Sequence, residues 1–419
     1  MKLVRPSKIS GTVSAPASKS MMQRAIAAAL LIDGTTKILN PTYCNDSLAA
    51  LRMIEALGAK VTRGKNEVIV RGGMKPLGSG TVLNCGESGL AIRMFSPIAA
   101  IWDEELTLTG EGSLLSRPVS MIEEPLNQLG VRVTTTNGCP PLKVKGPLIG
   151  GDATVDGSVS SQFLTGLLMA LPKAPQDSRL TVINLKSTPY IDMTLKLLDA
   201  FSVQVHHANY ETFFINGSQN YVCQNGEYWV EGDWSGVSFL LAAGAAAGCV
   251  TVTGLDTTSP QADRKILDTL AAAGALIETT KNTVTVKKGE LKGFQFDATH
   301  CPDLFPPLVA LACNCKGTTL ISGVDRLVHK ESNRAMALEK EFSSLGALIR
   351  IDSDRMEIKG VKLKGGIIDS HNDHRIAMAA AVAALNAQAA VTIQNAECVA
   401  KSYPDFFEDL KQIGGNVYE

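Results

Sequence analysis

The sequence predicts an α/β protein, with helices and sheets in mixed order, built from six copies of one unit. In residues 56–61 an apolar helix end is followed by Gly58 and then by a residue pattern typical of a β-strand. Related segments recur at intervals of 72 residues, and the last copy follows after 68. A unit of that length is too long for a solenoid repeat and holds two helices with several strands. The repeated positions are Gly58, Gly130, Ser202, Gly274, Gly346 and Gly414.

The repeated glycine predicts how each second helix ends. Glycine has no Cβ and therefore adopts the left-handed conformation that terminates many helices at little cost. Ser202 is the exception, and we expect it to be strained or capped differently.

Six units suggest a grouping of three and three. Segments with Pro and Gly at residues 11–17 and 226–232 are predicted to cross between the halves. The predicted lobes are residues 1–14 with 230–419, containing repeats four to six, and residues 15–229, containing repeats one to three. The first strand then belongs with the carboxy-terminal half.

Composition excludes several classes of protein. The 419 residues are 45% hydrophobic and 19% charged, with a formal net charge of −1. This balance supplies a large core and excludes a disordered chain or a basic protein that coats nucleic acid. Residues 235–255 and 376–396 are uncharged but rich in small and polar residues, so they predict a buried helix running into a strand rather than a membrane span.

The chain also carries no sign of export or of a metal site. The apolar run at residues 25–32 is short and no small-residue cleavage site follows it. The nine cysteines are scattered, and Cys313 with Cys315 is interpreted as a pair of buried thiols. We therefore expect a protein of the reducing cytoplasm.

Charged and small residues gather where helices are predicted to begin. Lys19, Ser20 and Arg24 precede or open an apolar run, and a helix start offers unpaired N–H groups and a positive dipole end to an anion. An ordinary N-cap with solvated cations explains this single segment equally well. Repetition across the units favours a shared anion site. The other starts are at residues 86–89, 160–162, 330–334 and 372–375, with Asp303 before a further apolar run.

These residues, in this order and spacing, closely resemble the 5-enolpyruvylshikimate-3-phosphate synthase family of enolpyruvyl transferases. The resemblance implies six βαβαββ units in a two-lobed inside-out α/β barrel, with the active site in the cleft between lobes that close on substrate. It runs along the whole chain. The matching segments are Ser18-Lys19-Ser20 with Arg24, Ser160-Ser161-Gln162, Ser187-Thr188-Pro189-Tyr190, Glu231-Gly232-Asp233, Lys330-Glu331-Ser332, Asp373-His374-Arg375 and Lys401-Ser402-Tyr403-Pro404-Asp405.

The resemblance implies transfer of the enolpyruvyl group of phosphoenolpyruvate to the 5-hydroxyl of shikimate 3-phosphate, with release of phosphate. It implies no metal and no organic cofactor, and we expect a monomer. The positions that would bind shikimate 3-phosphate are Ser20, Arg24, Ser160, Ser161, Gln162, Ser187, Tyr190, Asp303 and Lys330. Those that would bind phosphoenolpyruvate are Lys19, Gly89, Arg117, Gln162, Arg334, His374, Arg375 and Lys401.

By the same resemblance, three residues would handle protons. Asp303 would deprotonate the attacking hydroxyl, while Glu331 and Lys19 would act at phosphoenolpyruvate. The two substrates together carry two phosphates and two carboxylates, so their binding needs a large set of cationic side chains such as the Lys and Arg positions named above.

The chain departs from the family pattern at several positions. Glu87 stands where the family has an amide near phosphoenolpyruvate, and Leu90 replaces a Thr. Arg326 and Val328 replace an Asn and an Arg before Lys330, and the usual Asp after Ser332 is Asn333. We therefore expect a raised requirement for phosphoenolpyruvate and altered sensitivity to glyphosate, both measurable in a steady-state assay.

Two alternatives stay open at this level. A sister transferase acting on UDP-N-acetylglucosamine shares the repeat fold, but it normally has Lys-Asn where this chain has Lys19-Ser20. A diverged paralogue would bind an anionic metabolite without turning it over. Phosphate release that requires both substrates separates an enzyme from a binding protein.

Overall fold

The computed structural model describes residues 1–73, 75–76 and 78–419. The chain divides into two compact units. Unit 1 comprises Met1–Ser18 with Glu231–Glu419, and unit 2 comprises Lys19–Val230.

Unit 2 holds three four-stranded sheets within the described residues, with two α-helices attached to each. The first repeat contains β14 (Glu227–Trp229), α1 (Lys19–Leu31), β3 (Thr35–Leu39), α2 (Asn45–Ala56), β4 (Lys60–Arg63) and β5 (Glu67–Arg71). The second contains β6 (Val82–Asn84), α3 (Gly89–Ala99), β7 (Glu105–Thr109), α4 (Glu123–Gln128), β8 (Arg132–Thr136) and β9 (Cys139–Lys145). The third contains β10 (Gly151–Asp156), α5 (Gln162–Ala170), β11 (Ser178–Ile183), α6 (Pro189–Ala200), β12 (Val205–Ala208) and β13 (Thr212–Ile215).

Unit 1 repeats this plan three times in the part of the chain that the structure covers. The fourth repeat contains β2 (Ile9–Ser14), α7 (Trp234–Ala247), β15 (Gly248–Thr253), α8 (Ile266–Ala272), β16 (Leu276–Thr279) and β17 (Thr283–Lys287). The fifth contains β18 (Gln295–Asp297), α9 (Phe305–Ala312), β19 (Thr318–Ser322), α10 (Arg334–Ser344), β20 (Leu348–Asp352) and β21 (Arg355–Lys359). The sixth contains β22 (Gly366–Asp369), α11 (His374–Ala384), β23 (Val391–Gln394), α12 (Phe406–Gln412), β24 (Asn416–Tyr418) and β1 (Lys2–Arg5).

Short 3-10 helices occupy several connections. They are η1 (Gly112–Ser116), η2 (Ser120–Ile122), η3 (Leu171–Lys173), η4 (Gln224–Gly226), η5 (Ala262–Lys265), η6 (Pro302–Leu304), η7 (Val324–Leu327) and η8 (Ala396–Lys401).

Each sheet combines one parallel and two antiparallel pairings. In the second repeat β6 lies parallel to β7, β7 lies antiparallel to β9, and β8 closes the hairpin with β9. The parallel pair requires a crossover, which α3 supplies. The same order recurs in all six sheets, so the predicted α/β fold of six βαβαββ units is confirmed.

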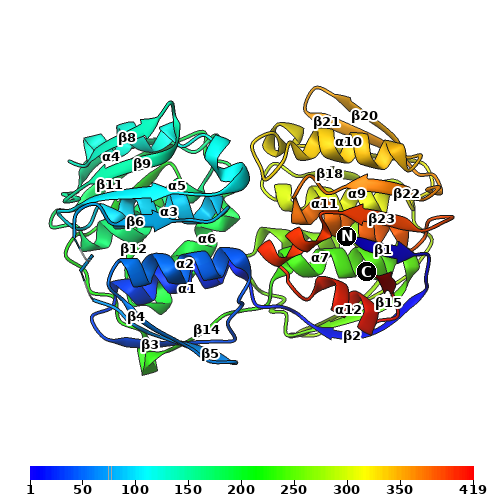
Figure 1. The fold of residues 1–419 in the computed structure, drawn as a ribbon, viewed down its shortest axis with the longest axis horizontal. Coiled ribbons are helices and arrows are strands. Elements are labelled where there is room, and N and C mark those ends of the chain that lie inside the picture. The colour runs from blue at the N-terminus through cyan, green and yellow to red at the C-terminus, as the bar shows by residue number, and fades with distance from the viewer. Residues whose placement is uncertain (74, 77) are drawn as a thin grey trace. The chain divides into compact units, whose positions relative to one another are not determined.

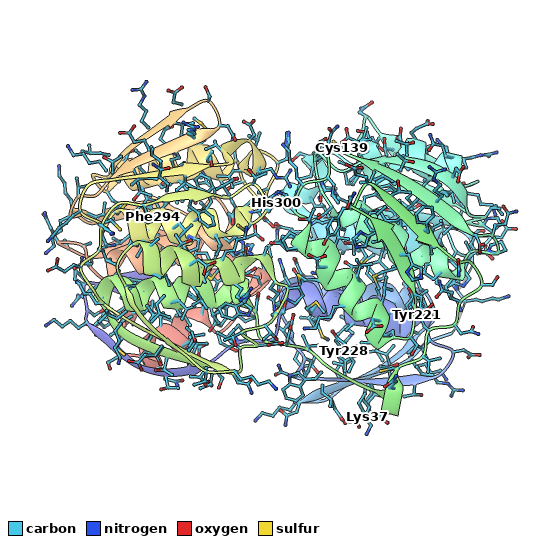
Figure 2. The ribbon with its side chains drawn as sticks, turned by 180° about the vertical axis from the view of Figure 1, so that it is seen from behind. Lys37, Cys139, Tyr221, Tyr228, Phe294 and His300 are labelled. Carbon is cyan, nitrogen blue, oxygen red and sulfur yellow. The ribbon has the colours of Figure 1, made fainter. Side chains whose placement is uncertain are left out.

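Three sheets borrow a strand from a distant part of the sequence. β14 pairs with β3, β2 pairs with β15, and β1 lies between β23 and β24. Figure 1 shows β1 beside β23, with both chain ends in unit 1, and Figure 2 labels Lys37 of β3 and Tyr228 of β14 on neighbouring strands. These pairings hold the ends of each unit's chain segments in place.

The first helix of each repeat forms the core of its unit. Every residue of α3 and of α11 is buried, and α7 is buried from Gly236 to Ala247. Small residues permit close helix approach, and α7, α9 and α11 pack against one another while α3 packs against α5 and α1. The uncharged stretches are thus buried helices that run into β15 and β23, as predicted. Among the described residues no helix has the length and apolar character that crossing a bilayer demands.

The second helix of each repeat ends as the sequence predicts. Gly58 has a φ of 93°, its N–H donates to Glu55 O, and the next N–H, of Ala59, reaches back to Ile54 O at 2.9 Å. Ser202 makes the same pair of hydrogen bonds with a φ of 58°, so it is strained rather than differently capped. The other glycines with a positive φ at this position are Gly130, Gly274, Gly346 and Gly414.

Replacement of Gly346 by Ala measures the strain of this position. At a φ of 92° the new Cβ would have ordinary room, with Lys364 Cγ nearest at 3.4 Å. We expect the free energy of unfolding to fall by about 1–2 kcal/mol. The matched control is Ser202→Ala, because that position already carries a side chain, and its effect should stay below ~0.5 kcal/mol. Equal losses in chemical denaturation would contradict this interpretation.

Candidate active site

The predicted site residues occupy two positions that recur in every repeat. One is the start of the first helix, and the other is the segment between the second strand and the second helix. Each compact unit contains three repeats, so each contains three copies of both positions.

In unit 2 the first helices begin at predicted residues. Lys19 opens α1, Gly89 opens α3 after its N-cap Ser88, and Gln162 opens α5 after Ser161. Ser160 Oγ accepts a hydrogen bond from Gln162 N at 3.2 Å. The unpaired N–H groups of a first turn attract anions, and Lys19 adds a full charge.

Unit 1 has the same arrangement. Asp233 caps α7, and Asp303 lies in η6 immediately before α9. Asp373 caps α11 by accepting from Arg375 N at 3.0 Å, and His374 and Arg375 are its first two residues. His374 Nδ1 lies 3.7 Å from Asp373 Oδ1.

The second recurring position carries the remaining predicted residues. Arg117 follows η1, Ser187 and Tyr190 flank the start of α6, residues 330–334 lead into α10, and Lys401 ends η8. Lys401 is only 5% exposed, so it is not a surface residue. In the first and fourth repeats this position holds Asp46 and Asp263, which sequence reasoning missed.

Arg24 is the centre of a buried cluster in unit 2. It is 1% exposed and donates to Ser20 O, Tyr190 O, Thr165 Oγ1 and Thr194 Oγ1 at 2.9–3.4 Å. These four acceptors are uncharged, and burial lowers the pKa of Arg24 to about 10. The guanidinium is therefore held firmly while its charge remains available to an anion. Ser187, which lies shortly before Tyr190 in the sequence, has a strained φ of 62°.

A second group joins Gly89, Arg117 and Gln162. A Cβ added to Gly89 would lie 3.0 Å from the guanidinium of Arg117, so glycine permits this approach. Arg93 is 3% exposed and donates to Gln162 Oε1 and to Pro118 O, both at 2.9 Å. It thus fixes α5 and the Arg117 segment to α3.

Lys19 has a partner that the sequence did not reveal. Its Nζ lies 3.0 Å from Asp46 Oδ2, and the two side chains are 14% and 5% exposed. Asp46 is in the first turn of α2, where an acid is ordinary for the helix dipole. In the sequence, only its position in the repeat distinguishes Asp46 from an ordinary acid at a helix start.

In unit 1, Arg334 gathers three carboxylates. It is 1% exposed, and it donates to Asp373 Oδ2 at 2.7 Å, to Asp303 Oδ1 at 2.9 Å and to Glu331 Oε2 at 2.5 Å. Burial lowers the pKa of Arg334, but these carboxylates outweigh it and raise the pKa above its usual value. Ser332 adds a hydrogen bond to Asp373 at 3.1 Å. The predicted residues of two repeats therefore form one network.

Asp303 lies where three cations converge. Arg375 Nη2 is 3.0 Å from Asp303 Oδ2, and Lys330 Nζ is 3.7 Å from Oδ1. Burial raises the pKa of Asp303, but Arg375, Lys330 and Arg334 outweigh it and hold the pKa well below its usual range. Burial also lowers the pKa of Lys330 to about 8, against the attraction of Asp303. Asp303, whose side chain is 20% exposed, is thus an ionised carboxylate that solvent can reach.

Glu87 turns toward the segment that precedes Arg117. Its Oε2 accepts a hydrogen bond from Ser113 Oγ at 3.5 Å, and a Cβ added to Gly112 would clash with its Oε1. In the described ranges, no group of His, Cys, Asp and Glu side chains has the geometry of a metal site.

Fold and site together define an α/β repeat protein with buried cations and carboxylates at helix starts. The family model for EPSP synthase (3-phosphoshikimate 1-carboxyvinyltransferase) matches residues 3–410. The chain is 39% identical to the 3-phosphoshikimate 1-carboxyvinyltransferase of Methanocorpusculum labreanum, covering 100% of both chains, and 38% identical to that of Clostridium novyi, covering 99% and 97%.

Solved structures agree. EPSP synthase from Acinetobacter baumannii is similar with a TM-score of 0.83 and 25% identity, covering 100% of both chains. The enolpyruvyl transferase NikO from Streptomyces tendae shares the fold, with a TM-score of 0.80 at 18% identity over 100% and 98% of the chains. The chain belongs to the EPSP synthase family.

The Asp373→Asn substitution tests the Arg334 network. It removes one of the three carboxylates that contact the buried guanidinium, so we expect the free energy of unfolding to fall by about 3 kcal/mol. The matched control is Asp405→Asn, because Asp405 also precedes a helix but its side chain makes no capping hydrogen bond. Urea denaturation should show a small effect for the control. Comparable losses for both variants would contradict the network's role.

Proposed function

We propose that this protein transfers the enolpyruvyl group of phosphoenolpyruvate to the 5-hydroxyl of shikimate 3-phosphate and releases phosphate. Membership of the EPSP synthase family supports the reaction. The observation that carries the proposal is the ionised Asp303 held among Arg334, Arg375 and Lys330, with Glu331 bound to the same Arg334. That set supplies acid–base groups and anion-binding cations in one network.

Shikimate 3-phosphate is proposed to bind through charged and hydroxyl side chains at helix starts. Arg24 and Ser20 would hold its carboxylate, since Arg24 is a buried cation with uncharged partners. Hydroxyls at the starts of α5 and α6, with Lys330, would surround its phosphate, and Tyr190 and Gln162 would line its ring. The hydroxyl donors are Ser160, Ser161 and Ser187.

Phosphoenolpyruvate is proposed to bind through the larger set of cations. Arg117 and Gly89 lie together at the start of α3, and bidentate guanidinium groups suit carboxylate and phosphate alike. The other proposed contacts are Lys19, Gln162, Arg334, His374, Arg375 and Lys401.

The chemistry balances without a redox step. The 5-hydroxyl loses its proton to Asp303 while its oxygen bonds to C2 of phosphoenolpyruvate and C3 gains a proton from Glu331 or Lys19. The tetrahedral adduct then expels phosphate while a proton returns from C3 to Glu331 or Lys19, which restores the double bond, and the proton on Asp303 passes to the departing phosphate. Asp46 would keep Lys19 charged and oriented at 3.0 Å between turnovers.

We further propose that the protein acts as a monomer in the cytoplasm. All nine cysteines are free thiols, which suits a reducing compartment. The predicted effect of Glu87 on the requirement for phosphoenolpyruvate and on glyphosate sensitivity stays a prediction.

Asp303→Asn and Glu331→Gln test the proton-transfer roles. Each should lower kcat for phosphate release by about 100-fold or more while the affinity for shikimate 3-phosphate changes little, as expected for general acid–base groups. Asp325→Asn is the control, because Asp325 is an exposed acid in η7. Wild-type protein should release phosphate only with both substrates. Loss of binding in parallel with turnover would overturn the assignment.

Lys330 predicts a pH dependence. Its pKa of about 8 means that its positive charge is present below that pH and is lost as the pH rises through it. We therefore expect kcat/KM for shikimate 3-phosphate to fall above pH 8 in the wild type. Lys330→Arg keeps the charge throughout this range, so its profile should lack that decline. An unchanged decline in the variant would refute the role of Lys330.

A further inference from the structure

Asp263 occupies the recurring position between the second strand and the second helix. It lies in η5, after β15 and before α8. In four other repeats this position carries Arg117, Tyr190, Arg334 or Lys401, all proposed to contact substrate. Asp263 itself has no role in the reaction described above.

The contacts of Asp263 leave it incompletely paired. Its Oδ2 accepts a hydrogen bond from Ser235 Oγ in the first turn of α7. Asp263 is only 1% exposed. Among the described residues Oδ1 has no hydrogen-bond partner. Burying a carboxyl group in this way is costly, so a purely structural benefit does not account for it.

The charges around Asp263 come from several elements. The negative charges of Asp303 in η6 and of Asp233, the cap of α7, act on the Asp263 carboxyl group, and so does the positive charge of Arg375 in α11. Lys265 and the Cys301 thiol also lie nearby. Burial first, and then the charge of Asp303, raise the pKa of Asp263 to about 7 against the opposing effect of Arg375.

Ion pairs link three cations and three carboxylates in this network. Arg334, Arg375 and Lys330 contribute three positive charges to the network, and Asp303, Glu331 and Asp373 contribute three negative charges. Asp263 is a further carboxyl group beside this set. Its ionisation adds one negative charge to the surroundings of Asp303.

We propose that Asp263 is a positioning residue that tunes Asp303 for proton transfer: its negative charge partly offsets the cations around Asp303 and so allows Asp303 to accept the proton of the substrate hydroxyl. The inference rests on the proposed role of Asp303 as the base. Three cations make an isolated Asp303 a weak base, and a weak base transfers protons slowly. No atom is transferred to or from Asp263, which acts through its charge alone.

The test is the pH profile of kcat for phosphate release in Asp263→Asn. Wild-type kcat should fall as the pH drops through 7, the pKa of Asp263, because protonated Asp263 no longer supports Asp303. The variant should be about tenfold slower than the wild type at alkaline pH and should match it at acid pH, since both then carry a neutral group. Asp268→Asn removes an exposed acid from the neighbouring α8 and should follow the wild-type profile.

Convergence of the two profiles at low pH is the decisive feature, because a merely structural defect slows the enzyme at every pH. A constant ratio between variant and wild type, or no difference at alkaline pH, would overturn the proposal. Ser235→Ala gives an independent check, since it removes a hydrogen bond that favours the ionised form of Asp263. It should move the midpoint of the kcat step to higher pH, and an unmoved midpoint also counts against the proposal.

Thermal unfolding provides a readout that needs no substrate. An aspartate in the unfolded chain has a pKa of about 3.9. Between this pH and about 7, Asp263 therefore holds a proton in the folded state that it has lost in the unfolded state. Wild-type stability should therefore decline as the pH rises over this range. The Tm of Asp263→Asn should rise relative to the wild type with increasing pH. A Tm difference independent of pH would show that Asp263 does not titrate there.

The experiment separates this inference from the proposed function. If Asp303→Asn retains turnover, the base has been wrongly assigned and the proposed function fails in that respect. If Asp303→Asn abolishes turnover while the Asp263→Asn profile stays parallel to that of the wild type, only the role of Asp263 is refuted.

Discussion

The buried guanidinium of Arg334 joins the fifth and sixth repeats in unit 1. Its donors reach Asp303 before α9, Asp373 at the start of α11 and Glu331 before α10, so one side chain positions segments from two repeats. A buried cation requires such partners, and the carboxylates in turn require the cation. The ionisation of Asp303 and the capping of α11 both follow from this mutual dependence. The chemistry proposed for the chain rests on the same contacts.

Unit 2 also contains a buried arginine, but the groups that accept its hydrogen bonds differ in charge. Arg24 is equally buried, but its acceptors are two carbonyl oxygens and two threonine hydroxyls. An arginine held by neutral groups still favours an anion, whereas Arg334 is already compensated. The same repeat thus holds one buried arginine with neutral acceptors in unit 2 and another with carboxylates in unit 1.

Local rules predicted the repeat and the charged residues at helix starts, whereas the family resemblance implied the roles of the candidate site residues. Gly58 and its equivalents follow from the left-handed helix end, and Lys19 and Arg375 follow from charge at helix starts. The pairing of β14 with β3 could not be predicted, since it joins residues about 190 apart and strand patterns carry no partner information. Asp46 and Asp263 were missed because an acid at a helix start usually has a capping or dipole role. The period of 72 residues was the signal that could have found them.

The central proposal is that the chain binds one molecule of shikimate 3-phosphate and that Arg24 and Lys330 both contribute to its affinity. Calorimetric titration of this ligand into the wild type, Arg24→Gln and Lys330→Gln tests it most directly. The account predicts one molecule per chain, with each substitution weakening that single site by about tenfold or more, since a hydrogen bond to a charged group is lost. Two molecules per chain, or full affinity in either variant, would contradict it.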